Sequence, residues 1–187
     1  MWQKLLRESS FFLLLLSFDR DLAEEVRAKG CPHCASALHS GRYDRKPRGA
    51  PPDLPPEYDR RESFCCSAEG CRKRVRPPSL RFFGRRVYLG PAFLLASAMI
   101  HGITEKRAAA LRDLLGVSKR TLERWRAWWR EVFPQSGFWR SARGRFVPPV
   151  VLSSLPASLL ERFGQNGDSN TAFMALKFLS PLTAGSA

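Results

Sequence analysis

The chain has 187 residues, enough for one medium-sized domain or two small ones. Its 31 Lys and Arg residues outnumber the 17 Asp and Glu residues, and the net charge of +14 indicates a polyanion as the natural partner. A hydrophobic content of 44%, with five Trp and 13 Phe residues, excludes a wholly disordered chain.

The N-terminal lead, residues 1–29, is expected to be helical. Its apolar run at residues 11–16 follows Lys4 and Arg7, as in a secretory signal, but the run is short, lacks a small-residue cleavage site and is followed at once by acidic residues. A membrane helix needs roughly 20 apolar residues, which no window of the sequence supplies. We therefore predict one or two short helices that end at Gly30, in a cytoplasmic chain with no membrane partner.

The next segment, residues 30–90, contains the five cysteines of the chain and is predicted to be a zinc ribbon with a Pro-rich insertion. The expected ligands of one structural zinc ion are Cys31, Cys34, Cys66 and Cys71. The first pair has the C-x2-C spacing of a zinc knuckle, and the second pair has the wider C-x4-C spacing. Cys65 is the alternative to Cys66. We favour Cys66, because the shorter loop between it and Cys71 closes more readily on one metal. An odd number of cysteines in a reducing cytosol argues against a disulfide framework.

Two other interpretations of the cysteines stay open. His33 or His39 could replace a cysteine as a ligand, although His33 lies inside the first knuckle and would compete with its neighbours. The cysteines could instead be unrelated buried thiols, but a C-P-x-C motif followed by a second clustered pair favours a metal site.

Basic residues follow the second cysteine pair directly: Arg72, Lys73 and Arg74. Four thiolates around Zn²⁺ leave a net negative charge, which these cations would offset while they keep the cysteines deprotonated. We also expect the three cations to face DNA.

Two further stretches of this segment carry predictions. The sequence "RKPRG", residues 45–49, resembles basic peptides that bind the DNA minor groove, because a proline holds the chain extended between cations. A solvated loop between the knuckles is the simpler interpretation. Residues 80–89 are rich in aromatic and apolar side chains, and they are predicted to form a strand with a bulge at Gly84.

Residues 91–140 are expected to form a three-helix domain. The predicted helices cover residues 91–101, 103–115 and 119–133. Gly116 ends the second helix and Ser118 caps the third, so that a three-residue turn joins them. A short Gly-containing turn before a helix with basic residues in its first half is typical of a helix-turn-helix, whose second helix enters the major groove of DNA. A plain helical bundle with solvated charges is the alternative.

The third helix has a predicted buried face and a predicted DNA face. At about 100° per residue, the buried stripe consists of Leu122, Trp125, Trp129, Val132 and Phe133. We expect Lys119, Arg120 and Arg124 to contact DNA. Ser118 would bind a phosphate at the helix N-terminus. Trp128 falls outside the stripe, and it could pack on the first helix, on the zinc module or on sugar-phosphate.

The segment "GVSKRTLERWRAWW" resembles the helix-turn-helix of transposases and related mobile-element proteins. "CPHC" followed by a Cys-rich basic strand resembles the zinc ribbons that precede such domains. Residues 30–138 as a whole resemble short bacterial zinc-ribbon plus helix-turn-helix proteins that are associated with transposition genes. The resemblance implies the metal ligands given above and a groove-facing helix start at residues 118–124. The C-x4-C spacing departs from the pattern and leaves the choice between Cys65 and Cys66 open.

The tail, residues 141–187, has two apolar segments, at residues 155–163 and 171–179, that we expect to be short helices. Glu161 and Asp168 are its only acids, too few for the three carboxylates of an RNase H-like transposase. We therefore predict an α+β chain with a small zinc-ribbon module, a three-helix helix-turn-helix domain and a short helical tail. Its expected role is non-catalytic binding of double-stranded DNA, as a transcriptional regulator or as a mobile-element helper whose candidate partner is a transposase or another protein. No enzymatic activity and no small-molecule substrate are expected.

Two other classes of function stay open. The chain could be the remnant of a larger transposase that has lost its catalytic domain, which a catalytic reading frame directly downstream would support. It could also be an RNA-binding or protein-interaction zinc ribbon, which a preference for single-stranded RNA over duplex DNA would favour.

Overall fold

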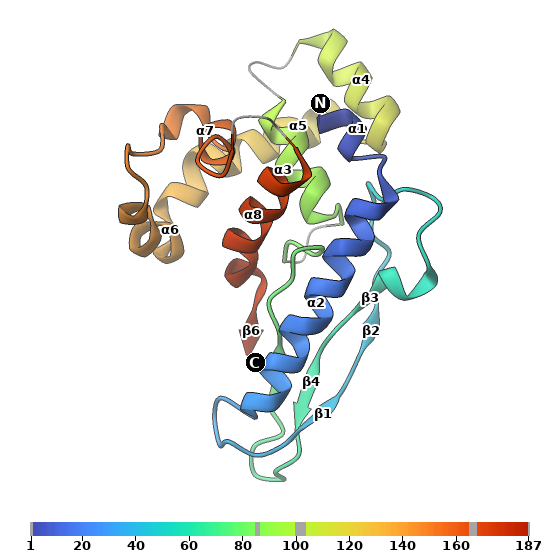
Figure 1. Cartoon of the computed structure of the whole chain (residues 1–187), viewed down its shortest axis with the longest axis vertical. Coiled ribbons are helices and arrows are strands. Elements are labelled where there is room, and N and C mark those ends of the chain that lie inside the picture. Colours follow the sequence, from blue (N-terminus) through green and yellow to red (C-terminus); the bar gives the residue numbers. More distant parts are fainter. Residues whose placement is uncertain (1, 85–86, 100–103, 165–167, 187) are drawn as a thin grey trace.

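In the computed structural model, most of the chain is helical and a small antiparallel sheet lies towards one end of the molecule, which makes the fold α+β (Figure 1). The structure describes residues 2–84, 87–99, 104–164 and 168–186. The α-helices are α1 (Trp2–Leu5), α2 (Ser9–Lys29), α3 (Gly90–Ala98), α4 (Glu105–Leu115), α5 (Lys119–Ala127), α6 (Gly137–Ala142), α7 (Ala157–Leu160) and α8 (Ser169–Leu179). The strands are β1 (Leu38–Ser40), β2 (Tyr43–Asp44), β3 (Arg60–Arg61), β4 (Phe64–Cys66), β5 (Arg74–Arg76) and β6 (Gly185–Ser186). The chain also has short helical turns: η1 (Pro56–Asp59), η2 (Trp128–Val132), η3 (Phe133–Gln135), η4 (Arg143–Arg145), η5 (Leu152–Ser154) and η6 (Ser180–Thr183).

The larger sheet has the strand order β1-β4-β5-β6, and all neighbouring strands are antiparallel. Leu38 in β1 lies opposite Cys66 in β4, and Phe64 in β4 lies opposite Val75 in β5. These residues pack with Ala23 of α2 into a small core of their own. Strands β2 and β3 form a second, two-stranded sheet. Because β6 pairs with β5, a strand from the tail completes the sheet that carries two of the cysteines.

Helix α2 has 21 residues and is longer than the short helices expected for the N-terminal lead. Phe12 and Leu15, in the apolar run that resembled a secretory signal, are fully buried in the main core. Burial of one apolar face stabilises a helix of this length. Gly30 ends the helix as predicted, with a φ of 76° and its N–H bonded to the Arg27 carbonyl. No helix in the described part of the chain is long and apolar enough to cross a membrane.

A buried ion pair joins α2 to the segment that links the sheet to the helices. Asp19 and Arg81 are each 1% exposed, and the Arg81 Nε donates to Asp19 Oδ2 over 2.8 Å. The same carboxylate accepts hydrogen bonds from the Ser79 hydroxyl and the Leu80 N–H. Arg81 also donates to the carbonyl of Tyr58 in the insertion. Both charges are therefore well provided with partners, as buried charges must be.

The predicted strand at residues 80–89 is wrong for the described residues, 80–84 and 87–89, which contain only isolated pairings. Phe82 bridges Leu89, so the chain folds back on itself instead of extending. Two features favour this loop. The Ser79 hydroxyl accepts the N–H of Phe82, and Gly84 has a left-handed φ of 64°.

The main core is built around α3, whose nine residues are all buried. The Phe93 ring lies 5.1 Å from Phe83 and 5.4 Å from the stacked Trp129, measured between ring centroids. Helices α5, α7 and α8 pack on α3, so the tail docks on the helical part of the chain. Phe173 of α8 also contacts Phe18 of α2, with ring centroids 4.4 Å apart. The predicted end of the first helix and start of the second fall partly on residues 100–103, outside the described residues; α4 begins at Glu105.

The predicted third helix is α5 continued by η2, a π-helical turn, and by η3. Four members of the predicted buried stripe are buried, but Val132 is 53% exposed and its prediction is wrong. The Phe133 N–H bonds to the Trp128 carbonyl, five residues back, and this wider turn shifts the helical phase beyond residue 128. Trp128 packs on Phe93 of α3, with ring centroids 5.3 Å apart, which is the first of the three placements considered for it.

Candidate metal centre and basic surface

Four cysteine sulfurs converge between the end of α2 and the β4–β5 loop. They belong to Cys31, Cys34, Cys66 and Cys71, and their Sγ atoms lie within 4.8 Å of one another. The Sγ atoms of Cys31 and Cys71 are 3.8 Å apart, and those of Cys34 and Cys66 are 3.3 Å apart. A tetrahedral ion with metal–sulfur bonds of about 2.3 Å requires sulfurs about 3.8 Å apart. The four cysteines therefore fit a metal ion.

Backbone geometry orients the sulfurs for a metal. Ala35 and Arg72 directly follow the second cysteine of each pair, and they have left-handed φ values of 58° and 46°. This conformation turns the next N–H, that of Ser36 or Lys73, towards the preceding sulfur. Cys66 receives the corresponding N–H of Ala68. Hydrogen bonds to sulfur favour the thiolate, which is the metal-binding form.

The sulfurs do not share negative charge equally when the metal is absent. The Ser36 hydroxyl and N–H lower the pKa of Cys34 to about 6. Burial, together with the neighbouring thiols, raises the pKa of Cys66 to about 12. The Lys73 N–H lowers the pKa of Cys71, but burial and the thiols of Cys34 and Cys31 raise it by more. Four thiols this close cannot all ionise unless a cation balances them, so metal binding and proton release are coupled.

Cys65 is not part of this group of sulfurs. It alternates with Cys66 along β4, so the two side chains leave opposite faces of the strand. Its Sγ lies 3.6 Å from the Arg72 carbonyl and is half-buried. The exposed histidines His33 and His39 are also outside the group. The structure thus brings Cys66, the favoured alternative, to the other three cysteines.

At the other end of the long axis, α4 and α5 meet through a tight turn (Figure 1). Gly116 has a left-handed φ of 63°, and its N–H bonds to the Arg112 carbonyl over 2.7 Å. Val117 is fully buried beneath the turn. The Ser118 hydroxyl accepts the N–H of Thr121 and caps α5, as predicted.

The basic residues of α5 differ in how they are engaged. Arg120 and Arg124 are exposed, and Arg124 is steadied by a 3.1 Å hydrogen bond to the Thr121 hydroxyl. Lys119 instead forms an ion pair with Glu105 of α4. This pair raises the pKa of Lys119 and lowers the pKa of Glu105. Arg120 and Arg124 are therefore more available to a ligand than Lys119.

The cations of the second knuckle do not adjoin those of α5. Arg72, Lys73 and Arg74 are exposed in the β4–β5 loop and the start of β5, beside the cysteines. Figure 1 shows the loops of both cysteine pairs at one end of the molecule and α4 and α5 at the opposite end. A ligand that touches both groups of cations must extend along the molecule.

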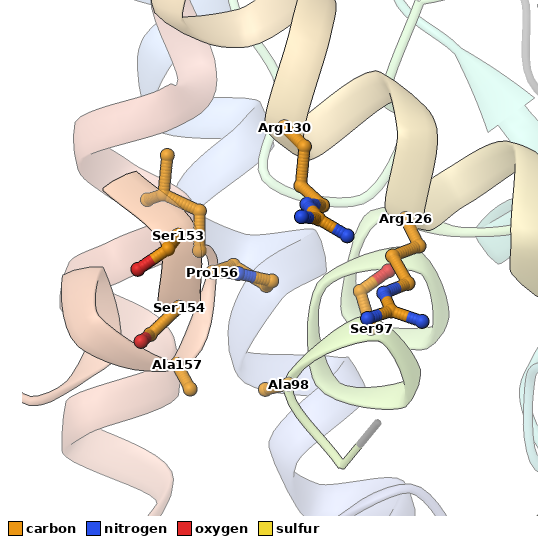
Figure 2. A pocket seen from close by; sticks show the side chains of 9 residues that line it. Ser97, Ala98, Arg126, Arg130, Ser153, Ser154, Pro156 and Ala157 are labelled. Atoms are coloured by element: carbon orange, nitrogen blue, oxygen red, sulfur yellow. The ribbon is translucent and has the colours of Figure 1, made fainter. Parts of the chain in front are cut away.

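A polar pocket of about 170 Å³ lies between α3, α5 and the tail (Figure 2). Arg126 and Arg130 line one side of the pocket, and Ser153, Ser154 and Pro156 of the tail line the opposite side. Among the described residues, the lining contains no carboxylate, histidine or cysteine, so this part of it offers neither a general base nor a metal ligand. At about 100° per residue, Arg126 lies roughly 160° around α5 from Arg124 and roughly 120° from Arg120.

No family model, curated protein or solved structure matches this chain. The geometry of the chain itself is therefore the basis for any functional assignment.

Proposed function

We propose that the chain is a non-catalytic protein that binds double-stranded DNA through α4 and α5, acting as a helix-turn-helix, and that it carries a structural zinc ribbon. The observation that carries the proposal is the construction of α5. Its cap is the last residue of a three-residue turn, its apolar face is buried on α3, and Arg120 and Arg124 remain exposed. This is the arrangement that presents the first half of a helix to the major groove.

The residues of α5 have distinct roles in this proposal. Arg120 and Arg124 contact base edges, as guanidinium groups do when they bind guanine in the major groove. Ser118 lies at the helix N-terminus, where the free N–H groups favour a phosphate. Lys119 adds a phosphate contact once it exchanges Glu105 for DNA.

Zinc has a structural role in the proposal. Four cysteines complete a tetrahedron and leave no open position for substrate, as in structural rather than catalytic zinc sites. The exposed Arg72, Lys73 and Arg74 balance the thiolates and contact the phosphate backbone.

The test is duplex-DNA binding by the purified full chain at two salt concentrations, followed by fluorescence anisotropy, with metal content determined on the same samples. Arg120→Ala plus Arg124→Ala should weaken binding by about thirtyfold or more, because each of the two base contacts contributes about 1–3 kcal/mol. The matched control is Arg126→Ala plus Arg130→Ala, which removes the same charge from the same helical stretch but on side chains that line the pocket. Equal losses in both double variants would contradict a specific role for the first pair.

The same samples separate the rival functions. Bound zinc without affinity for duplex DNA would overturn the proposal and favour a protein partner. A preference for single-stranded RNA would favour the RNA-binding alternative. Absence of metal from the purified chain would exclude the zinc ribbon.

A further inference from the structure

The basic segment at residues 45–49 is fixed to the body of the protein. Its first residue, Arg45, donates from Nη1 to the Gly84 carbonyl over 2.9 Å. The same guanidinium group lies 5.3 Å from the centroid of the Phe82 ring. The start of the segment is therefore anchored by a side chain, unlike a freely solvated loop.

The end of the segment is anchored by its backbone. The Arg48 N–H donates to the Val87 carbonyl over 2.9 Å, and the Arg48 carbonyl accepts from the Leu89 N–H over 3.0 Å. Gly49 has a left-handed φ of 82°, and a Cβ there would lie 2.7 Å from the Cβ of Ala92 in α3. The segment thus packs so closely on α3 that residue 49 cannot carry a side chain without a shift.

Tyr88 connects this segment to the turn before α5. It bridges Arg48 in a parallel pair, and its hydroxyl donates to the Gly116 carbonyl over 2.9 Å. Its ring also meets Trp125 of α5, with centroids 5.1 Å apart. Tyr88 therefore links Arg48 to the turn that positions α5. In the sequence, 68 positions separate Arg48 from Gly116, and 76 positions separate it from Arg124.

Lys46 and Arg48 leave their charges exposed in this fixed segment. Neither side chain has a hydrogen bond or an ion pair within the part of the chain that the structure describes. Exposure alternates along the segment, since Arg45 and Pro47 are half-buried and Lys46 and Arg48 are exposed. This alternation is that of an extended chain, in which residues two apart point to the same side, and Pro47 restricts the backbone between them. Two cations are therefore held side by side next to the α4–α5 turn.

We propose that Lys46 and Arg48 form a second DNA contact, which binds the phosphate backbone beside the groove that α5 enters. This inference rests on the proposed DNA-binding function of α5 and adds a site to it. The two surfaces act together because Tyr88 holds both in place, so the segment and α5 engage one duplex.

The test is the salt dependence of duplex-DNA affinity for the full chain carrying Lys46→Ala plus Arg48→Ala. Affinity falls with salt, and each phosphate contact contributes about −0.9 to the slope of log affinity against log salt concentration. Loss of two contacts should therefore make the slope shallower by about 1.8. A charge-retaining variant, Lys46→Arg plus Arg48→Lys, should keep the wild-type slope. Circular dichroism of each variant checks that the fold is kept, as expected for exposed side chains.

The matched control is Arg27→Ala plus Lys29→Ala, at the end of α2. It removes the same charge, and its side chains form only exposed ion pairs with Glu24 and Glu25, at the far end of the molecule from α5. A slope change equal to that of the control would overturn the second contact. If the wild-type chain does not bind duplex DNA at all, the proposed function itself fails. If binding depends on Arg120 and Arg124 but not on Lys46 and Arg48, only the second contact is wrong.

Discussion

The cysteine end and the aromatic end of this molecule are held together in different ways. Around the cysteines, strands of two or three residues enclose a core that has six buried side chains among the described residues. Around α3, stacked Phe and Trp rings belong to a far larger buried cluster. Because a small module cannot bury enough apolar surface to fold by itself, we expect the first region to need a bound metal and the second region to fold without one.

The largest expected effect is the unfolding of the cysteine end alone. Cys66→Ser removes one ligand of the proposed zinc ion, and because structural zinc contributes roughly 10–16 kcal/mol of binding free energy in small zinc modules, the cysteine end should lose both its metal and its fold. Hydrogen exchange should show lost protection in β1, β4 and β5 while α3 and α5 stay protected. Cys65→Ser is the control, since its sulfur lies outside the cluster, and it should keep the metal. Loss of protection in α3 as well would mean that the two regions are not independent.

The second-largest expected effect follows from loss of the buried ion pair between Asp19 and Arg81, which connects the two regions. Asp19→Ala leaves Arg81 buried without its carboxylate, so the free energy of unfolding should fall by about 3–5 kcal/mol. Chemical denaturation, followed by tryptophan fluorescence, measures the loss. Asp21→Ala, on the exposed side of the same helix, should change stability little. Similar losses of unfolding free energy for both variants would contradict a stabilising role for the ion pair.

A smaller effect tests the helical region at its turn. Ser118→Ala removes the acceptor for the Thr121 N–H and should cost about 1 kcal/mol of stability. Replacement by Asp, which caps equally well, should restore that stability but weaken DNA binding by its negative charge. A cap that matters only for folding would leave the affinity of the Asp variant unchanged, contrary to the proposed phosphate contact.

The smallest expected effect is a gain in stability, and it concerns the cysteine end. Ala35→Gly should raise stability by about 0.5 kcal/mol, because glycine adopts the left-handed φ at this position without strain. The same substitution at Ala28, within α2, should lower stability, since glycine disfavours a helix. Thermal unfolding of the metal-loaded chain compares them. A loss at both positions would mean that the φ of Ala35 stores no strain.

Local patterns in the sequence were sufficient for much of this structure. Cysteine spacing identified the four sulfurs that converge, and the shorter loop correctly favoured Cys66 over Cys65 as the member of the cluster. Gly30, Gly116 and Ser118 marked helix ends because capping depends on a few neighbouring residues. These features are fixed over short stretches of chain.

The features that the sequence did not predict depend on distant contacts or on an altered period. Val132 was misplaced because a π-helical turn breaks the regular helical repeat. The ion pair of Lys119 with Glu105 was not predicted, because Glu105 comes within reach only when α4 packs on α5. The left-handed Arg72 gave no signal, since glycine is the residue usually expected there. Nothing in the pattern of residues 45–49 indicated that Tyr88 would join them to Gly116.

Helix α2 has a consequence for synthesis of the chain on the ribosome. Several groups that cover this helix are made after it: Asp19 is buried by Ser79, Leu80 and Arg81, and Phe18 contacts Phe173 in α8. Until those segments emerge, an apolar helix face is open to solvent and to other nascent chains. Such a face is a natural substrate for the chaperones that act during translation.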